Sequence, residues 1–312
     1  MLLKTSPKKE TILIIKHGAL GDVILATGAF AAIRAHHLDA HIVLLSSPPY
    51  SKMLSAAPWF DEIWTDQRAP WWNVLASWKI FQLLRRYKFQ RVYDLQTSRR
   101  SSFYFNFLRN PKPEFSGIVH GSTLCQTNPA RNKMPTQDRL ADQLAIAGIN
   151  NLPALDINWL KADYKIPATP YAVLIAGSSA HRLQKRWPAK NFIAIGKWLL
   201  SEGILPVLIG NHAESALLAQ IAAALPEALN LCNKTSLGEL TTILSAAKFA
   251  LGNDTGPMHL AAAANCPSIV LFSNASDPYL YAPKGEHVRV LQKDNLADLS
   301  VDEVKDLIRL NL

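Results

Sequence analysis

The stretch Leu251–Ala264, LGNDTGPMHLAAAA, joins an apolar run to a series of small residues that favour a helix. Its centre is rich in Asn, Asp, Thr and Gly before Pro257. This composition is typical of a helix start, where Pro is tolerated and Asp or Thr can cap free N–H groups. Those N–H groups and the positive end of the helix dipole can hold an anion. The stretch therefore predicts an anion-binding helix start with His259 in its first turn; an ordinary capped helix with a surface histidine is the alternative.

The same order of strand, loop and helix recurs along the chain. Residues 11–15 and 41–46 are short unbroken apolar runs that predict buried strands, and residues 23–36 between them follow helical periodicity. Further strands are predicted at 61–65, 91–95, 172–176, 205–209, 249–251 and 268–272. Further helices are predicted at 71–87, 138–147, 191–201, 213–224, 237–247 and 301–310, whereas 110–137 resembles irregular loop. Successive strand–helix–strand units predict an α/β fold with parallel sheets and right-handed crossovers.

The length and one proline-rich segment predict two domains. A chain of 312 residues is long for one core and suits two domains of about 150 residues each. Three prolines and little periodicity mark the segment from Pro153 to Pro170. We therefore expect one domain over 1–160 and a second over 161–312.

The composition limits the class of protein. The net charge of +9 favours anionic partners. Three scattered cysteines, Cys125, Cys232 and Cys266, lack metal or redox spacing, so we expect reduced thiols in a cytoplasmic protein. No stretch approaches the roughly 20 apolar residues that cross a bilayer, so any membrane contact is expected to be peripheral.

Polar residues that follow predicted strands are candidates for chemistry. Asp22 comes after a Gly-x-x-Gly turn, where its carboxylate could act as a general base toward a hydroxyl or simply stabilise a helix start. Ser178, Ser179 and Lys185 follow the strand at 172–176, and a flexible ammonium can neutralise a diphosphate leaving group; a solvated basic loop is the alternative. Glu214 follows the strand at 205–209 and could accept hydrogen bonds from ribose hydroxyls, or lie on the surface at a helix start.

Several common catalytic signatures are missing from the sequence. It contains no G-x-G-x-x-G or G-x-x-x-x-G-K-[ST] loop, which argues against nicotinamide chemistry and phosphate-loop hydrolysis. It also contains no H-E-x-x-H zinc motif, no Asp-x-Asp pair and no G-x-S-x-G elbow. We therefore predict neither a metal nor a cofactor.

Five motifs occur in order along the chain: Leu20-Gly21-Asp22-Val23, Lys185-Arg186-Trp187-Pro188, Gly210-x-x-x-Glu214, Thr235-Ser236-Leu237-x-Glu239-Leu240 and Asn253-Asp254-Thr255-Gly256-Pro257-Met258-His259. Taken together, they resemble the bacterial ADP-heptose:lipopolysaccharide heptosyltransferase family. The resemblance implies the GT-B architecture, in which two Rossmann-like domains face a central cleft. It implies an acceptor on the N-terminal side, a nucleotide sugar on the C-terminal side, and inverting transfer without a required metal. It leaves open whether the terminal helix packs back on the first domain.

The resemblance also implies roles for single residues. Asp22 would deprotonate the acceptor hydroxyl. Ser178, Ser179, Lys185 and the helix start at Thr255 and Gly256 would hold the departing diphosphate. Glu214 would meet the nucleoside or its ribose, and Asp254 and His259 would line the donor sugar and phosphate.

The resemblance also suggests a partner for the basic segment of the first domain. Between residues 79 and 139, twelve Lys or Arg residues stand against three acids. We expect this stretch, with Arg99 and Arg100 as contacts, to face the phosphorylated core of a lipid-anchored acceptor at the cytoplasmic membrane surface; a merely solvated basic face is the alternative. Two alternatives are a sugar-nucleotide 2-epimerase on the same architecture and a basic nucleic-acid-binding protein. The second has no recognisable binding module, so no nucleic acid is expected.

Overall fold

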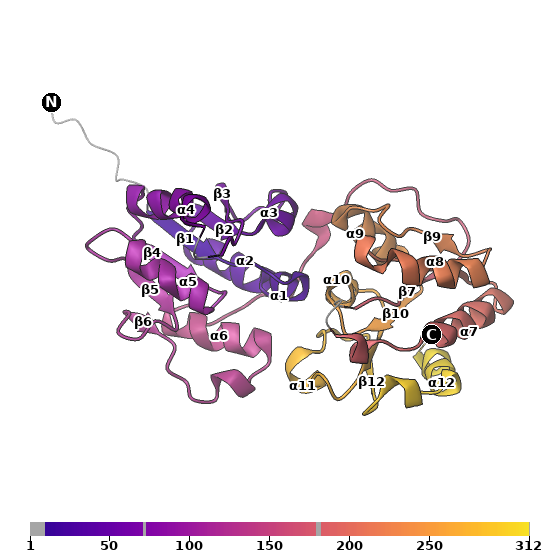
Figure 1. The fold of residues 1–312 in the computed structure, drawn as a ribbon. Coiled ribbons are helices and arrows are strands. Elements are labelled where there is room, and N and C mark those ends of the chain that lie inside the picture. Colours follow the sequence, from indigo (N-terminus) through magenta and orange to yellow (C-terminus); the bar gives the residue numbers. More distant parts are fainter. Residues whose placement is uncertain (1–9, 71–72, 179–181, 312) are drawn as a thin grey trace. The chain divides into compact units, whose positions relative to one another are not determined.

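The computed structural model describes residues 10–70, 73–178 and 182–311 and divides into two compact units, Met1–Leu155 and Asp156–Leu312. Figure 1 shows that each unit has its own sheet flanked by helices. Both sheets have six strands, and all neighbouring strands in them run parallel. The predicted α/β fold with two Rossmann-like parallel sheets is confirmed.

The first sheet has the order β3-β2-β1-β4-β5-β6. Its strands are β1 (Thr11–Ile15), β2 (His41–Ser46), β3 (Glu62–Thr65), β4 (Arg91–Asp94), β5 (Glu114–Gly117) and β6 (Leu124–Cys125). The chain winds from β1 toward one edge and then returns to β4 on the other side of β1. Ligands of such sheets bind at this reversal, beyond the carboxyl ends of the two central strands. Because Ile15 pairs with Asp94, the residues that follow both strands emerge side by side.

The helices of the first unit are α1 (Leu20–Leu25), α2 (Thr27–His36), α3 (Pro48–Leu54), α4 (Val74–Arg86), α5 (Arg99–Phe103) and α6 (Thr136–Ile146). Two short 3-10 helices, η1 (Tyr104–Phe107) and η2 (Arg131–Lys133), accompany them. The helix predicted over 71–87 corresponds to α4; residues 71 and 72 lie outside the described part of the chain.

Two local predictions for the first unit were wrong. The single helix expected over 23–36 is two helices, because the Thr27 hydroxyl donates to the Ile24 carbonyl at 2.7 Å and competes with the helical pattern around Ala26. The loop expected over 110–137 contains β5 and β6. These strands are short and Phe115 is the one bulky apolar residue of β5, so their sequence carries little strand signal.

The second sheet has the order β12-β11-β10-β7-β8-β9. Its strands are β7 (Tyr171–Ile175), β8 (Leu205–Leu208), β9 (Leu229–Asn230), β10 (Phe249–Asn253), β11 (Ser268–Phe272) and β12 (Val288–Gln292). Here the order reverses between β7 and β10. Strands β9 and β12 were not predicted: β9 has two residues, and β12 is largely exposed and lacks a continuous apolar run.

The helices of the second unit are α7 (Ala189–Ser201), α8 (Ser215–Ala224), α9 (Leu237–Ala246), α10 (Gly256–Ala263), α11 (Pro278–Tyr281) and α12 (Val301–Asn311). The 3-10 helices are η3 (Asn158–Leu160), η4 (Leu183–Lys185), η5 (His212–Glu214) and η6 (Leu296–Asp298). Val304 and Ile308 of α12 are buried in the core of the second unit, where this helix packs on α7. Among the described residues, no helix combines the length and apolar character needed to cross a bilayer.

Each unit has a hydrophobic core made by strands that are buried on both faces, as parallel sheets require. Trp187 in the second core is nearly fully buried, meets Phe192 edge-on and donates its indole N–H to the Leu299 carbonyl at 2.9 Å. This anchor holds the end of the loop that carries Lys185 against the sheet.

Candidate functional site

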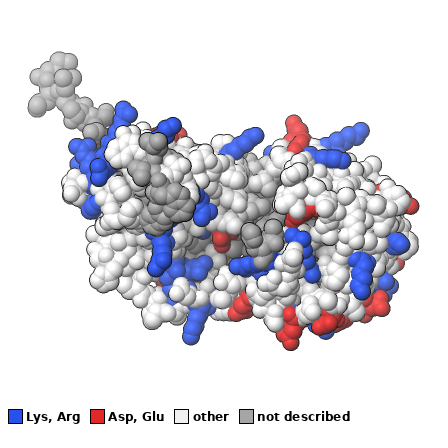
Figure 2. All heavy atoms as spheres, in the orientation of Figure 1, with Lys and Arg blue, Asp and Glu red and all other residues white. Residues whose placement is uncertain are grey.

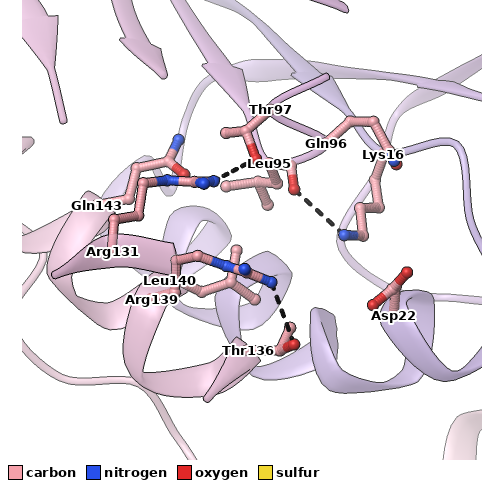
Figure 3. A pocket seen from close by; sticks show the side chains of 10 residues that line it. All are labelled: Lys16, Asp22, Leu95, Gln96, Thr97, Arg131, Thr136, Arg139, Leu140 and Gln143. Atoms are coloured by element: carbon pink, nitrogen blue, oxygen red, sulfur yellow. Dashed lines mark hydrogen bonds between the residues drawn. The ribbon is translucent and has the colours of Figure 1, made fainter. Parts of the chain in front are cut away.

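A polar pocket lies at the carboxyl ends of β1 and β4, where the first sheet reverses its strand order (Figure 3). It is lined by Lys16, Asp22, Leu95, Gln96, Thr97, Arg131, Thr136, Arg139, Leu140 and Gln143. This is the position where parallel α/β sheets place their ligands.

Three cations and one carboxylate dominate the pocket. In Figure 3 the Lys16 ammonium and the Asp22 carboxylate point toward one another, and the guanidinium groups of Arg131 and Arg139 approach from η2 and α6. Burial lowers the pKa of Lys16, although the charge of Asp22 opposes this shift. Burial and the neighbouring Arg139 also lower the pKa of Arg131. Crowded positive charges of this kind favour the binding of an anion.

The hydrogen bonds that orient these cations go to neutral oxygens. Lys16 Nζ donates to the Leu95 carbonyl at 3.2 Å. Arg131 donates from Nε to Gln126 Oε1 at 2.7 Å and from Nη2 to the Thr97 hydroxyl. Arg139 Nη2 donates to the Thr136 hydroxyl at 3.2 Å. These hydrogen-bond partners are uncharged, whereas the charges of Asp22 and Asp94 act on Lys16 and those of Asp94 and Asp142 act on Arg131. The three cations can still contact an anionic ligand.

Asp22 lies in the first turn of α1, as the sequence predicted. One carboxylate oxygen, Oδ2, accepts the Ala19 N–H at 3.2 Å, and the side chain is half-buried at the pocket. A carboxylate held in this way retains lone pairs that can accept a proton from a bound hydroxyl. The helix-start and base interpretations of Asp22 are therefore compatible.

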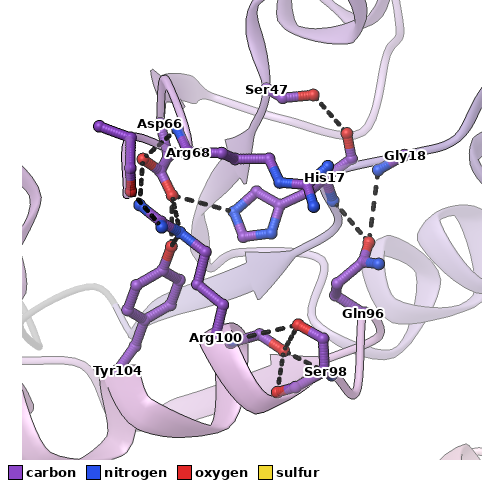
Figure 4. Close-up of polar contacts among 11 residues, drawn as sticks. His17, Gly18, Ser47, Asp66, Arg68, Gln96, Ser98, Arg100 and Tyr104 are labelled. Carbon is purple, nitrogen blue, oxygen red and sulfur yellow. Dashed lines mark hydrogen bonds and ion pairs between the residues drawn. The ribbon is translucent and has the colours of Figure 1, made fainter. Parts of the chain in front are cut away.

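The loop between β1 and α1 is fixed by polar contacts on both sides (Figure 4). Gln96 Oε1 accepts the N–H groups of His17 at 2.9 Å and Gly18 at 3.3 Å. The Ser47 hydroxyl donates to the His17 carbonyl. Gly18 has φ +135°, and a Cβ there would lie 2.3 Å from the Tyr50 ring, so this position requires glycine. These contacts hold in place the loop that leads from β1 to Asp22.

Arg100 does not line the pocket and belongs to a separate network beside this loop (Figure 4). Its Nε and Nη2 donate to the two Asp66 carboxylate oxygens at 3.0 and 3.1 Å. Burial opposes ionisation of Asp66, but hydrogen bonds from Arg100 and Tyr104 hold its pKa below the usual value. His17 Nε2 lies 3.7 Å from Asp66 Oδ2, and burial lowers the pKa of His17 to about 4. Arg100 thus joins α5 to the end of β3, and Arg99 is exposed on α5.

In the second unit, residues that follow β7 and β10 meet. Lys185 forms a buried ion pair with Asp254. Asn253 is fully buried. Its Oδ1 accepts the backbone N–H of Trp187 at 2.9 Å, and its Nδ2 donates to the Ala176 carbonyl at 2.8 Å. The sequence places Asn253 in the fifth motif, directly after the apolar run, but assigns it no role of its own. Asn253 therefore connects the loop that carries Lys185 to the ends of β7 and β10.

Ser178 organises the start of the same loop. Its hydroxyl accepts the Arg186 Nε–H at 3.1 Å and donates to the Arg182 carbonyl at 3.3 Å. Arg186 Nη2 donates to the Ser178 carbonyl at 2.9 Å. Ser179, the other predicted hydroxyl, lies outside the described residues.

Glu214 occupies a space left by two glycines at the ends of neighbouring strands. A Cβ on Gly177 would lie 1.6 Å from Glu214 Oε1, and a Cβ on Gly210 would lie 2.9 Å from Oε2. Oε2 accepts the Asn211 N–H at 2.8 Å, and Glu214 is buried. Glu214 does lie at a helix start, where it completes the capping box of η5, but it is buried, so the surface part of that alternative is wrong. Its carboxylate lies at the carboxyl edge of the sheet.

The predicted helix start beyond β10 is confirmed. Helix α10 begins at Gly256, with Pro257 in its first turn, and Thr255 is an extended N-cap whose side chain makes no capping hydrogen bond. His259 is buried, so the surface-histidine alternative is wrong. Within the described residues, no group of three or more His, Cys, Asp or Glu side chains has an arrangement suited to a metal ion.

Comparison with known proteins places this chain in a family. The model of glycosyltransferase family 9 (heptosyltransferase) matches residues 137–307, which is more than half of the chain. Lipooligosaccharide heptosyltransferase 2 of Haemophilus influenzae is 34% identical over 100 residues, which cover 30% of this chain and 29% of that protein. The counterpart of the same name in Haemophilus ducreyi is 24% identical over 306 residues, which cover 86% of this chain and 84% of that protein.

Solved structures share the fold. The structure of E. coli ADP-heptose lps heptosyltransferase II has a TM-score of 0.78 and 21% identity, and the match covers 96% of this chain and 98% of that one. A UDP-N-acetylglucosamine 2-epimerase from Methanocaldococcus jannaschii has a TM-score of 0.58 and 12% identity over 98% of this chain and 93% of that one. These similarities show the fold, and the family model shows the relationship. The chain belongs to glycosyltransferase family 9, the heptosyltransferase family.

Proposed function

We propose that this protein is an inverting glycosyltransferase that moves a heptose or a related sugar from an ADP-sugar to a hydroxyl of a lipopolysaccharide core acceptor. The observation that carries the proposal is the placement of Asp22 in a pocket with Lys16, Arg131 and Arg139, in a member of a heptosyltransferase family. A base beside three cations suits an acceptor that has both a reactive hydroxyl and anionic groups.

In the acceptor half of the reaction, Asp22 takes the proton of the attacking hydroxyl. Lys16, Arg131 and Arg139 bind a phosphate or carboxylate of the acceptor, with the planar guanidinium groups suited to two-point contacts. This assignment replaces Arg100, whose guanidinium is engaged by Asp66, as the acceptor contact expected from the sequence. Arg99 remains a candidate because it is exposed.

In the donor half, a bond forms between the acceptor oxygen and the anomeric carbon of the sugar while the bond to the diphosphate breaks. Lys185, Ser178, Ser179 and the N–H groups at Thr255 and Gly256 receive the charge of the departing ADP. Fixed positive groups of this kind stabilise developing negative charge, which is the role that a divalent cation has in other transferases. We propose that the donor diphosphate competes with Asp254 for Lys185, and that Asp254 and His259 contact the sugar and phosphate.

Glu214 is proposed to accept hydrogen bonds from the ribose. Its carboxylate lies at the ends of β7 and β8, where nucleosides bind in related sheets. The first unit, residues 1–155, would then bind the acceptor, and the second unit, residues 156–312, would bind the nucleotide sugar.

A thermal-shift panel with ADP-, UDP-, GDP- and dTDP-sugars tests the donor. A ligand well above its Kd stabilises the native protein by a few kcal/mol, at about 2.7 kcal/mol for a hundredfold excess over Kd. ADP compounds should raise the unfolding temperature and the other nucleotides should not. Stabilisation by another nucleotide alone would reject the ADP-heptose donor.

Product analysis tests the reaction class. With ADP-heptose and a lipid-linked core acceptor that lacks the heptose, the protein should release ADP and extend the acceptor. An epimerase would isomerise a nucleotide sugar without any acceptor. Because the acceptor is lipid-linked, we propose that the reaction takes place at the cytoplasmic face of the inner membrane.

A further inference from the structure

The whole net charge of the protein lies on the first unit. Residues 1–155 contain 19 Lys or Arg and 10 Asp or Glu, a net charge of +9, whereas residues 156–312 contain 14 of each and are neutral. On the face that Figure 2 shows, Lys and Arg side chains accordingly outnumber acidic ones over the first unit. The pocket accounts for only three of these cations.

Helix α4 presents an aromatic and basic face to solvent. Trp78, Phe81, Gln82, Arg85 and Arg86 line a shallow groove, and their spacing of three, four, seven and eight residues from Trp78 places them on one side of the helix. Trp78 is 48% exposed, and both arginines are exposed. The opposite side is buried in the core through Ser77, Ile80 and Leu84. We name the five groove residues the α4 face.

Aromatic packing supports the α4 face from below. Phe81 stacks on Phe107 of η1 with ring centroids 3.8 Å apart, and the Arg85 guanidinium lies over the same Phe107 ring at 5.6 Å. Desolvation and the charge of Arg85 lower the pKa of Lys112, which is exposed nearby. Arg85 is thus held over an aromatic ring, and its positive charge acts on Lys112.

The surrounding sequence supplies almost no negative charge. Between residues 68 and 113 there are ten Lys or Arg, and the one acid within this segment, Asp94, is fully buried. Two of the ten, Arg91 and Arg100, pair with Glu114 and Asp66 just outside the segment. An exposed tryptophan beside the two exposed arginines Arg85 and Arg86 is complementary to a bilayer interface with anionic headgroups. The indole would enter the interface while the arginines remain at the level of the phosphates.

We propose that the α4 face docks the first unit on an anionic lipid surface, with Trp78 in the interface and Arg85 and Arg86 on the lipid phosphates. The proposal goes beyond glycosyl transfer and does not require it, because the α4 face shares no residue with the Lys16 pocket. Docking of this kind would concentrate the enzyme at the membrane where a lipid-linked acceptor resides.

Vesicle co-sedimentation of the full chain tests the proposal. The protein should bind vesicles that contain phosphatidylglycerol, binding should weaken as salt rises, and vesicles of phosphatidylcholine alone should bind little. The double variant Arg85→Glu/Arg86→Glu should lower the partition onto anionic vesicles by more than about tenfold. Trp78→Ala should lower it by roughly tenfold without changing the salt dependence.

Matched controls separate docking from general charge and from misfolding. Lys197→Glu/Lys248→Glu makes the same change in charge at exposed positions of the second unit, and Leu38→Ala truncates an exposed apolar side chain elsewhere on the first unit. Both controls should bind vesicles like the wild type. If the Arg85→Glu/Arg86→Glu variant does not fold, the milder variant Arg85→Gln/Arg86→Gln replaces it in the vesicle-binding measurement.

Three outcomes would overturn the proposal: a wild type that does not bind anionic vesicles, α4 variants that bind like the wild type, or controls that lose binding equally. Self-association that Trp78→Ala abolishes, without vesicle binding, would assign the α4 face to a second copy of the chain instead. Since ADP-sugar binding can be measured on the same samples, failure here is distinguishable from failure of the proposed transferase function.

Discussion

The Glu214 carboxylate occupies the space that a side chain at residue 177 would need, since a Cβ on Gly177 would lie 1.6 Å from Glu214 Oε1. Because Gly177, just beyond β7, has no side chain, there is room for the carboxylate of Glu214, which lies in η5 beyond the neighbouring strand β8. Gly177→Ala should displace Glu214 and weaken ADP binding by about ten- to a hundredfold, the usual effect of losing a hydrogen bond to a charged group. Isothermal titration of ADP measures it.

A double-mutant cycle identifies the cause. If the clash with the carboxylate is responsible, Gly177→Ala should cost little more affinity in a Glu214→Ala background. Gly285→Ala, at an exposed glycine of the same unit, is the control and should leave ADP affinity unchanged. Full additivity of the two substitutions would contradict the proposed link between Gly177 and Glu214.

The arginines of the pocket should govern the acceptor and not the donor. Arg131→Gln and Arg139→Gln should each raise the KM for the anionic acceptor about tenfold or more, with an effect that shrinks at high salt. Affinity for ADP should stay unchanged, because both residues belong to the first unit. Arg99→Gln provides the comparison at an exposed site; a larger KM effect there than at Arg131 would shift the acceptor subsite to α5.

Asp94 should make the first unit less stable as the pH rises. It is fully buried, and burial raises its pKa to about 6 from 3.8 although hydrogen bonds to the carboxylate oppose this shift. Between these values the native state binds more protons than the unfolded state, so the free energy of unfolding falls as the pH rises from about 4 to about 6 and then levels off. The full difference is about 3 kcal/mol at 1.36 kcal/mol for each pKa unit.

Asp94→Asn isolates this effect. The amide oxygen can still accept the N–H groups of Gln96 and Thr97, which Asp94 Oδ1 accepts at 3.1 and 2.9 Å. Urea denaturation at pH 5 and pH 8 should show a loss of stability in the wild type that the variant lacks. An equal loss in both proteins would place the titrating group elsewhere.

Asn253 should be important for the stability of the second unit, because it holds the loop that carries Lys185. Replacing it by Ala leaves the buried Trp187 N–H and the Ala176 carbonyl without their partner, at a cost of about 3 kcal/mol. Scanning calorimetry should show a lower unfolding temperature for Asn253→Ala. Asn191→Ala, at a half-buried position on α7, should change it little; equal effects would deny Asn253 its anchoring role.

The sequence predicted those parts of the fold whose signal is local. Unbroken apolar runs identified β1 and β2, and the turn before Pro257 identified the start of α10. Strands β5 and β12 were missed because short or exposed strands lack such runs. Their pairing is imposed by neighbouring strands and not by their own residues.

The convergence of distant residues could not be predicted in the same way. Twelve basic residues between 79 and 139 were visible, but nothing local indicates that Arg131 and Arg139 join Lys16 while Arg100 turns to Asp66. Lys16 had one signal, its position directly after the buried strand 11–15. The burial of Glu214 likewise depends on glycines in two other segments.

The role of Asp22 as general base is tested most directly by measuring the turnover of Asp22→Asn with ADP-heptose and a lipid-linked core acceptor. The amide can keep the contact with the Ala19 N–H but cannot take a proton from the acceptor hydroxyl. We expect kcat to fall by about a hundredfold or more, the range for general base catalysis, with the Kd for ADP unchanged. A variant that retains wild-type kcat would contradict the assignment of Asp22 as the base.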